Sequence, residues 1–271
     1  MTMKLSISNI AWNAKDDATV YAMMRKYGYA GLEIAPTRIF ETNPYDDLSA
    51  VKSWRETFDA QEGFEIPSMQ SIWFGKTQKL FEDEAQRQEL FDYTKKAIDF
   101  AAAIRCRNLV FGSPKNRVLP DVSDKTLWKQ GVAFFKKLGD YAMHNGTTIG
   151  MEANPAIYNT NYINTTKEAL DLVRETESEG FLLNLDVGTM LENRETVEIL
   201  EGKIRAVNHV HISEPFLKPI VMDRDRKHFH GELAAFLREN GYQGYVSVEM
   251  GKIEDLSVID EILAYGKELF G

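Results

Sequence analysis

Short apolar runs rich in β-branched residues recur along the chain, and each is followed by a longer stretch with the periodicity of an amphipathic helix. The apolar runs predict strands at 4–10, 31–35, 65–73, 108–113, 148–153, 181–187, 206–213 and 245–250. The longer stretches predict helices at 16–27, 47–62, 82–104, 123–145, 166–178, 193–202, 229–240 and 254–269. Glycine follows several of these helices, as expected where a helix ends in the left-handed conformation.

Strands that alternate with helices pair in parallel through right-handed crossovers. Eight strand–helix units in ~250 residues match the size of a closed (β/α)8 TIM barrel, which is the predicted fold. An open doubly wound sheet is the alternative. Its glycine-rich phosphate turn is missing after the first strand, where the sequence reads NIAWNAKD. Because no linker or shift in composition interrupts the pattern, we predict one barrel domain over residues 1–271.

Composition narrows the class of protein. The 271 residues are 44% hydrophobic and 27% charged, as in an average globular domain. A net charge of −9 argues against nucleic acid as a partner. The single cysteine, Cys106, excludes an internal disulfide and a cysteine-based zinc site. We find neither an apolar run of ~18 residues nor a secretory signal, so we predict a cytoplasmic protein with no membrane partner.

Acidic residues and a histidine end the last four predicted strands. These are Glu152, Asp186, His211 and Glu249, each separated from the next by about one strand–helix unit. In a barrel, such positions meet at the rim that carries the active site. Three buried carboxylates would repel one another unless a cation lay between them. We therefore predict one divalent metal; this oxygen-rich set suits Mn²⁺, Mg²⁺ or Co²⁺, with Zn²⁺ as an alternative.

Six motifs carry a resemblance to a known family: GLEIAPT, FGSPKNR, GMEANP, NLDVG, HVHISEP and GYQGYVSVEM. Over nearly the whole chain, the pattern resembles the xylose-isomerase-like TIM-barrel superfamily of sugar phosphate isomerases and epimerases. The resemblance to ketose 3-epimerase-like members implies that the four residues above bind the metal, and that Glu152 and Glu249 also act as the acid/base pair. The residue types fit this chemistry apart from the resemblance. Proton transfer beside a carbonyl needs a Lewis acid, a base on one face of the carbon and an acid on the other.

The chain departs from those members at three positions that help to hold the sugar. Thr189 stands where they have histidine, Tyr158 where they have glutamate, and Leu217 where they have arginine. The metal and acid/base residues are kept while the residues around the substrate differ. A free ketohexose is therefore in doubt as the substrate.

Several residues near the predicted rim are candidates for substrate binding. They are Trp12, Gln70, Ser113, Lys115, Arg117, Asn154, Tyr158, Glu214 and His230. Arg117 suits a phosphate or carboxylate because its guanidinium is planar. Turn formation, core packing or exposure at a helix end would explain the same residues without a ligand. Glu33, at the end of the second strand, is a weaker candidate, and His209 is expected one layer deeper in the barrel, as a supporting or packed histidine.

These observations predict a metal-dependent isomerase or epimerase of a sugar, sugar phosphate or sugar acid that transfers protons through an enediolate with two glutamates. A dehydratase of a cyclitol or keto acid is the alternative, because it begins with the same proton abstraction. An endonuclease IV-like DNA-repair enzyme is less favoured, since its three-zinc cluster needs more histidines than the five present and a basic surface. The expected partner is a small carbohydrate substrate. The sequence is compatible with a homo-oligomer.

Overall fold

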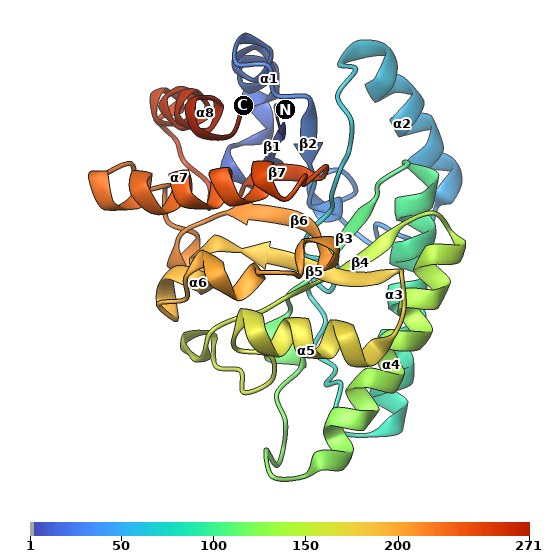
Figure 1. Ribbon diagram of the computed structural model, residues 1–271. Coiled ribbons are helices and arrows are strands. Elements are labelled where there is room, and N and C mark those ends of the chain that lie inside the picture. The colour runs from blue at the N-terminus through green and yellow to red at the C-terminus, as the bar shows by residue number, and fades with distance from the viewer. Residues whose placement is uncertain (1–2) are drawn as a thin grey trace.

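The computed structural model describes residues 3–271, which form a parallel sheet of seven strands. The strands are β1 (Lys4–Ser8), β2 (Gly31–Glu33), β3 (Asn108–Phe111), β4 (Thr148–Glu152), β5 (Phe181–Asp186), β6 (Val207–Ile212) and β7 (Tyr245–Val248). Their order is β2-β1-β7-β6-β5-β4-β3, so the last strand pairs with the first (Figure 1). This return of β7 to β1 is what a curled, barrel-like sheet requires.

Residues 65–70 fill the remaining gap, between β2 and β3. Met69 forms isolated bridges to Ile34 and to Leu109, and its N–H donates to the carbonyl of Asn108 at 2.9 Å. Pro67 has no amide hydrogen to donate, so pairing along this segment is intermittent. The TIM-barrel fold is thus confirmed, but the strand predicted at 65–73 is an irregular segment.

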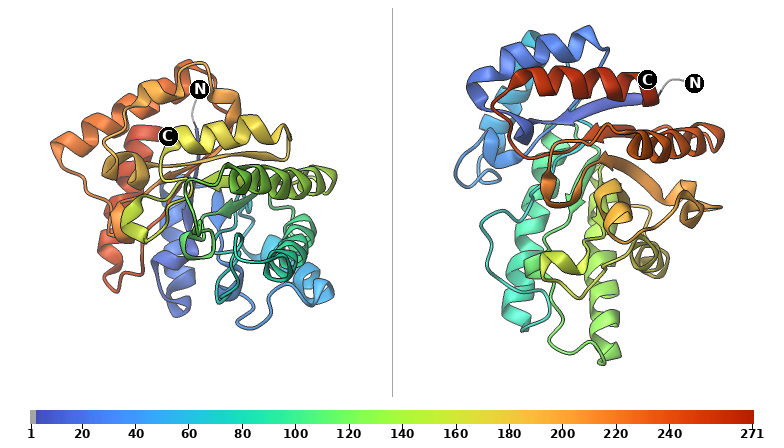
Figure 2. Two further views of the ribbon diagram at one scale, coloured as in Figure 1. Left: turned by 90° about the horizontal axis from the view of Figure 1, so that it is seen from below. Right: turned by 90° about the vertical axis from the view of Figure 1, so that its left-hand side faces the viewer.

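Helices cover the outer face of the sheet (Figures 1 and 2). They are α1 (Asp17–Lys26), α2 (Leu48–Gln61), α3 (Glu84–Ala103), α4 (Lys125–His144), α5 (Thr166–Thr176), α6 (Val187–Glu192), α7 (Arg224–Glu239) and α8 (Leu256–Phe270). Side-chain caps fix several of their starts. Thr165 and Glu168 form a reciprocal capping box on α5, for example, which satisfies amides that the first turn leaves unpaired.

Two predicted helices begin elsewhere in the structure. The helix predicted at 193–202 is wrong: α6 begins directly after β5, because the Asp186 carboxylate accepts the N–H of Thr189 and caps the helix. Only a 3₁₀ turn, Val197–Leu200, falls in the predicted range. Helix α7 begins at Arg224 rather than at 229, because Asp223 caps it by accepting the N–H of Arg226.

Small and polar side chains fill much of the barrel interior, where branched apolar residues are usual. The Asn108 amide donates to Ser68 Oγ at 3.0 Å and to Asn184 Oδ1 at 3.3 Å, which links β3 to β5 across the interior. A Cβ atom on Gly150 would lie 2.5 Å from Asn108 Oδ1, so this position leaves no room for a side chain. Polar contacts therefore run along the barrel interior, from Asn108 at the start of β3 to Asn184 on β5.

The two ends of the described chain meet beside the barrel, where the N–H of Met3 donates to the carbonyl of Phe270 at 3.3 Å (Figure 1). None of the helices within residues 3–271 combines the length and the apolar character needed to cross a membrane.

Candidate metal and catalytic site

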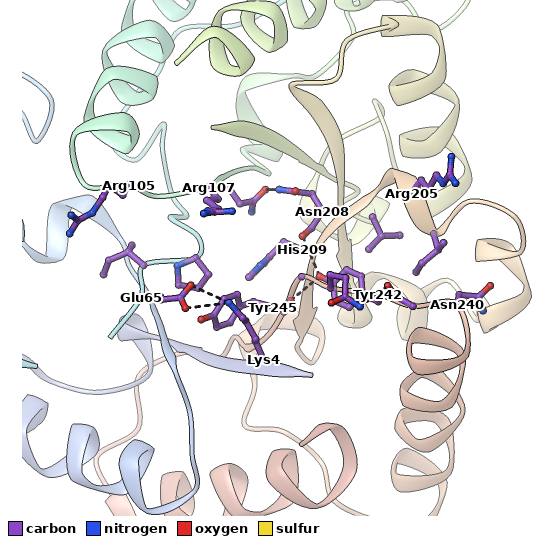
Figure 3. A pocket seen from close by; sticks show the side chains of 18 of the residues that line it. Lys4, Glu65, Arg105, Arg107, Arg205, Asn208, His209, Asn240, Tyr242 and Tyr245 are labelled. Atoms are coloured by element: carbon purple, nitrogen blue, oxygen red, sulfur yellow. Dashed lines mark hydrogen bonds and ion pairs between the residues drawn. The ribbon is translucent and has the colours of Figure 1, made fainter. Parts of the chain in front are cut away.

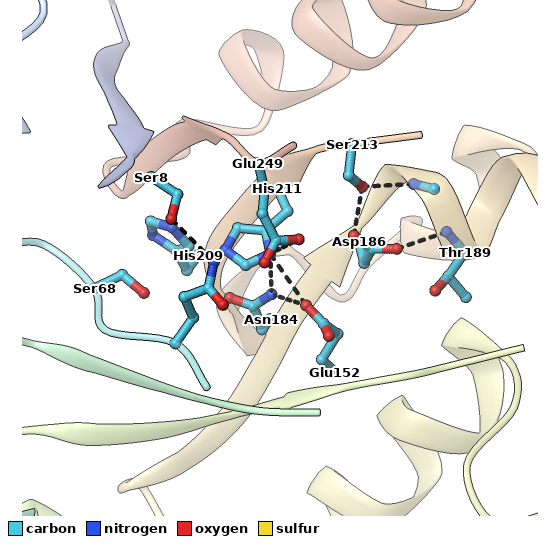
Figure 4. A network of polar contacts seen from close by, with 12 residues as sticks. Ser8, Ser68, Glu152, Asn184, Asp186, Thr189, His209, His211, Ser213 and Glu249 are labelled. Carbon is cyan, nitrogen blue, oxygen red and sulfur yellow. Dashed lines mark hydrogen bonds and ion pairs between the residues drawn. The ribbon is translucent and has the colours of Figure 1, made fainter. Parts of the chain in front are cut away.

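The structure brings the four predicted metal ligands together at one rim (Figure 4). One ligand atom from each of Glu152, Asp186, His211 and Glu249 lies within 4.8 Å of the others. The Nδ1 atom of His211 is 3.1 Å from Glu152 Oε1 and 3.3 Å from Glu249 Oε2. Four neighbouring elements, from β4 to the end of β7, thus supply one potential ligand each.

Strand register explains why these side chains meet. Asp186 pairs with His211 between β5 and β6, and Glu152 pairs with Asn184 between β4 and β5. Asn184 is two residues before Asp186, so its amide also faces the barrel interior. It donates to Glu152 Oε1 at 3.1 Å and lies 3.3 Å from His211 Nδ1, which holds both ligands in place.

The Asp186 carboxylate is fixed by the start of α6 and by Ser213, which directly follows β6. Its Oδ1 accepts the N–H of Thr189 at 2.6 Å, and its Oδ2 accepts the Ser213 hydroxyl at 2.5 Å. The Ser213 oxygen in turn accepts the N–H of Gly188 at 2.9 Å. Each oxygen keeps further lone pairs, so a carboxylate positioned in this way can still bind a cation.

Glu33 contacts His211 on the side of the ring that faces away from Glu152 and Glu249. The Nε2 atom of His211 lies 2.9 Å from Glu33 Oε2, and the same oxygen lies 3.1 Å from Nε2 of His209. All three side chains are buried. A histidine that binds a metal usually contacts a carboxylate through its other nitrogen, which fixes the ring. Glu33 is therefore placed to orient His211 toward the glutamates, and it does not line the cavity beside them.

Burial and mutual repulsion shift the pKa values of the cluster. Burial raises the pKa of Asp186 to about 6, and the charge of Glu152 adds to this shift. Burial likewise raises the pKa of Glu152 and of Glu249. Burial alone would lower the pKa of His211, but the charges of Glu33 and Glu249 raise it well above its usual value. The cluster thus favours extra positive charge.

The donor set fits a divalent cation. Three carboxylates and one imidazole face one another with their ligand atoms grouped, and hard cations prefer oxygen-rich sites. A cation here would take the place of the proton that His211 Nδ1 otherwise needs between two glutamates. The side of His211 away from the cluster already has its carboxylate partner, as metal-bound histidines require.

A cavity of about 230 Å³ opens beside the cluster. A Cβ atom on Gly112, which lines this cavity, would lie 2.8 Å from Glu152 Oε2, so a side chain there would displace the carboxylate. Among the residues that line the cavity, every ionisable side chain is a carboxylic acid or the phenol of Tyr158. The cavity therefore presents oxygen and amide groups, and its charge is negative.

Five predicted substrate residues line this cavity: Gln70, Ser113, Asn154, Tyr158 and Glu214. Within residues 3–271, the side chains of all but Ser113 already have protein partners, and those of Asn154 are Arg117 and Glu152. The Gln70 amide donates to Ser8 Oγ at 2.9 Å, and the Tyr158 hydroxyl accepts the N–H of Phe216 at 2.7 Å. The Glu214 carboxylate accepts two bonds from the guanidinium of Arg226, at 2.7 and 2.8 Å.

The predicted role of Arg117 is wrong. Its side chain is fully buried and does not line the cavity. It donates to the carbonyl of Glu152 at 3.0 Å and to Asn154 Oδ1 at 2.8 Å, and the Asn154 amide donates to Glu152 Oε2 at 3.2 Å. Burial lowers the pKa of Arg117 to about 10. Arg117 therefore supports the segment that carries Glu152 rather than meeting a substrate.

Three other predicted substrate residues also lie away from this cavity. Lys115 is exposed on the same turn as Arg117. Trp12 lines a neighbouring cavity of about 370 Å³, where its indole donates to Asp17 at 2.7 Å. His230 is buried where α7 packs on α8, with Nδ1 2.8 Å from the Tyr265 hydroxyl, and burial lowers its pKa to about 4. The predicted role of His230 is thus wrong.

Sequence reasoning missed Asn184, Ser213 and Arg226, which hold Glu152, Asp186 and Glu214 respectively. The first two could have been found, because each lies two residues from a predicted ligand on the same side of its strand. Arg226 gives no such signal, because the chain returns to the rim only at the start of α7.

Comparison with known proteins identifies the family. A family model for the xylose isomerase-like TIM barrel matches residues 21–268. The chain belongs to this family. No protein of curated function matches the sequence.

Solved structures of the same fold include sugar epimerases and a protein named as an AP endonuclease. The 3-keto-D-glucoside 4-epimerase of E. coli aligns with a TM-score of 0.74 and 16% identity, covering 98% of this chain and 99% of that one. A D-psicose 3-epimerase aligns at 0.73 and 18%, covering 99% and 100%. A family 2 AP endonuclease from Brucella melitensis aligns at 0.73 and 17%, with the same coverage. At such identities the likeness establishes the fold, and the activity must be argued from the site.

Proposed function

We propose that this protein is a divalent-metal-dependent epimerase or isomerase of a neutral, hydroxyl-rich keto-sugar or keto-glycoside. The observation that carries the proposal is the approach of Glu152 and Glu249 to one nitrogen of His211, at 3.1 and 3.3 Å, from separate elements of the barrel wall. Two carboxylates that converge beside a cavity can transfer protons to and from opposite faces of one carbon atom.

Glu152, Asp186, His211 and Glu249 would hold the metal, which supplies a Lewis acid that polarises a substrate carbonyl. One glutamate removes the proton from the carbon beside the carbonyl, and the other returns a proton to the opposite face. Burial raises both pKa values, which brings each group closer to the protonation balance that a general acid or base needs near neutral pH. One proton leaves and one enters, so the product is an isomer of the substrate.

The charge of the cavity favours a neutral substrate. Among the described residues, no lysine or arginine side chain lines the cavity, so a phosphate or carboxylate group would meet no cationic side chain there beside the proposed metal. The guanidinium of Arg226 is already occupied by Glu214, and Arg117 is buried beneath Glu152. By contrast, Gln70, Ser113, Asn154 and Tyr158 offer hydrogen-bonding groups for hydroxyls.

The test is a panel of neutral keto-sugars and 3-keto-glycosides, incubated with the Mn²⁺-loaded protein in D₂O. Epimerisation or isomerisation should place one deuterium on the reacting carbon, which NMR detects. Glu152→Gln and Glu249→Gln keep a carbonyl oxygen for the metal but cannot carry a proton. Each should lose ~10²–10⁴-fold in turnover while retaining much of the metal.

Glu254→Gln is the matched control, because Glu254 is exposed and contacts Asn13. It should turn over like the unaltered protein. A product lighter by one water would indicate a dehydratase, and cleavage of abasic DNA would indicate an endonuclease. If both active-site glutamine variants keep full turnover, the two-glutamate mechanism is wrong.

A further inference from the structure

A second cavity, of about 830 Å³, lies at the opposite end of the barrel from the metal ligands (Figure 3). Lys4, Asn108, Val207 and Tyr245, which begin β1, β3, β6 and β7, line it. In Figure 3, His209 lies in the middle of the opening, between Arg107 and Asn208 on one side and Lys4 and Tyr245 on the other. The volume lies within the usual range for a small-molecule site.

The charge of this cavity contrasts with the net charge of −9 of the chain. Five basic residues line it, together with one acid, Glu65: Lys4, Arg55, Arg105, Arg107 and Arg205. Lys4 pairs with Glu65 at 3.3 Å, and Arg55 and Arg105 share the single carboxylate of Asp59. Within residues 3–271, neither Arg107 nor Arg205 has a carboxylate at ion-pairing distance. Basic groups gathered in a concave site focus a positive potential.

Arg55 provides an independent sign of a missing acceptor. Its side chain is only 9% exposed. Its Nη2 contacts Asp59 Oδ1 at 2.7 Å and the carbonyl of Phe64 at 3.3 Å. Its Nε and Nη1 atoms are buried and have no hydrogen-bond partner. Buried donors are almost always satisfied, because leaving one unpaired costs the desolvation of a charged group.

We propose that this cavity binds a small phosphate-bearing molecule. Guanidinium groups match the geometry of phosphate oxygens, and a dianion would offset most of the uncompensated charge of the lining. The concave shape of the cavity favours a small ligand over a flat macromolecular surface. The position excludes the catalytic substrate as the occupant, because the acid/base pair lies at the other rim. The inference is therefore independent of the proposed function.

The test is calorimetric titration of the metal-loaded protein with two probes, inorganic phosphate and glycerol 3-phosphate. We expect saturable binding with a Kd of about 1 mM or below for at least one probe. Tighter binding of the ester would indicate a phosphorylated metabolite, and equal binding would indicate phosphate itself. The exposed pair Lys4→Gln/Arg107→Gln should weaken binding by about tenfold or more, since each removes a cation from the cavity wall.

Two variants locate the bound anion. Arg224→Gln removes an exposed charge at the start of α7 and should leave the Kd unchanged. Asp186→Asn weakens the metal site at the other rim and should also leave it unchanged. The proposal is overturned if the protein binds neither probe, if the Lys4/Arg107 double variant binds as well as the unaltered protein, or if Asp186→Asn abolishes binding.

Discussion

Glu33 lies 2.9 Å from Nε2 of His211, on the side of the ring that faces away from the proposed metal. The contact crosses the barrel from the end of β2 to β6, which are not neighbours in the sheet. It leaves Nδ1 of His211 directed at Glu152 and Glu249. The orientation of the only imidazole in the ligand set is thus decided by a carboxylate that cannot reach the metal cluster itself.

Replacing Glu33 by glutamine should weaken metal binding. The variant keeps the shape of the side chain but removes its negative charge. That charge orients His211 and makes the imidazole a stronger metal ligand. Loss of such a supporting carboxylate typically costs ~10–100-fold in metal affinity. Calorimetric titration with Mn²⁺ measures the change, with Glu254→Gln as the control for a glutamate outside the site. An unchanged Kd would show that Glu33 has no positioning role.

Replacing Gly112 by alanine should displace the Glu152 carboxylate. The added Cβ would lie 2.8 Å from Glu152 Oε2, closer than packing allows. We expect weaker Mn²⁺ binding and lower turnover together, because one group serves both purposes. Gly231→Ala is the control: it lies within α7 with open space around it, and should stabilise the protein by ~0.5–1 kcal/mol. Normal metal binding by Gly112→Ala would contradict the proposed ligand geometry.

Replacing Arg117 by methionine should lower the stability of the fold, and it should not specifically raise KM for anionic substrates. The change removes the bonds to the Glu152 carbonyl and to Asn154 Oδ1, and leaves both acceptors buried. Urea unfolding should show a loss of about 2–4 kcal/mol, against less than ~0.5 kcal/mol for the exposed control Arg224→Met. A stable variant whose KM rises only for an anionic substrate would instead restore Arg117 as a substrate contact.

Stability should depend on pH in opposite ways with and without metal. The Asp186 pKa is raised from 3.8 to about 6, so its protonated form stabilises the fold, and this contribution is lost as pH rises through that range. His211 acts in the same direction, because its pKa is also raised. Metal binding requires the deprotonated ligands and so strengthens with pH.

Thermal unfolding checks this prediction. Mn²⁺ should raise Tm more at about pH 7.5 than at about pH 5. Asp186→Asn should reduce the Mn²⁺ effect at the higher pH, while Asp124→Asn, an exposed helix cap on α4, should not. A metal effect that is equal at both pH values would argue against titrating carboxylates as ligands.

The fold and the grouping of the four candidate ligands were predictable because both depend on position along strands. Buried parallel strands read as apolar runs, and Glu152, Asp186 and His211 follow from where those runs end. Arg117 was not predictable: Ser113 adopts the left-handed conformation with φ of 47°, and the 3₁₀ turn Pro114–Asn116 then carries Arg117 beneath the rim. The irregular segment at 65–70 likewise reflects Pro67, whose effect depends on tertiary pairing.

The candidate metal ligands come from the second half of the chain, whereas part of the cavity wall comes from the first half. Strands β4 to β7 are consecutive neighbours and carry the metal cluster, whereas Gln70 and Ser71 extend from the irregular segment beside β2. Residues 65–70 are not a regular strand, yet their backbone bonds to Ile34, Asn108 and Val110 close the barrel between β2 and β3. The side chains of Gln70 and Ser71 can therefore vary while this backbone pairing and the ligand-bearing strands stay the same. A change of substrate contacts in this segment would thus leave the candidate metal ligands in place.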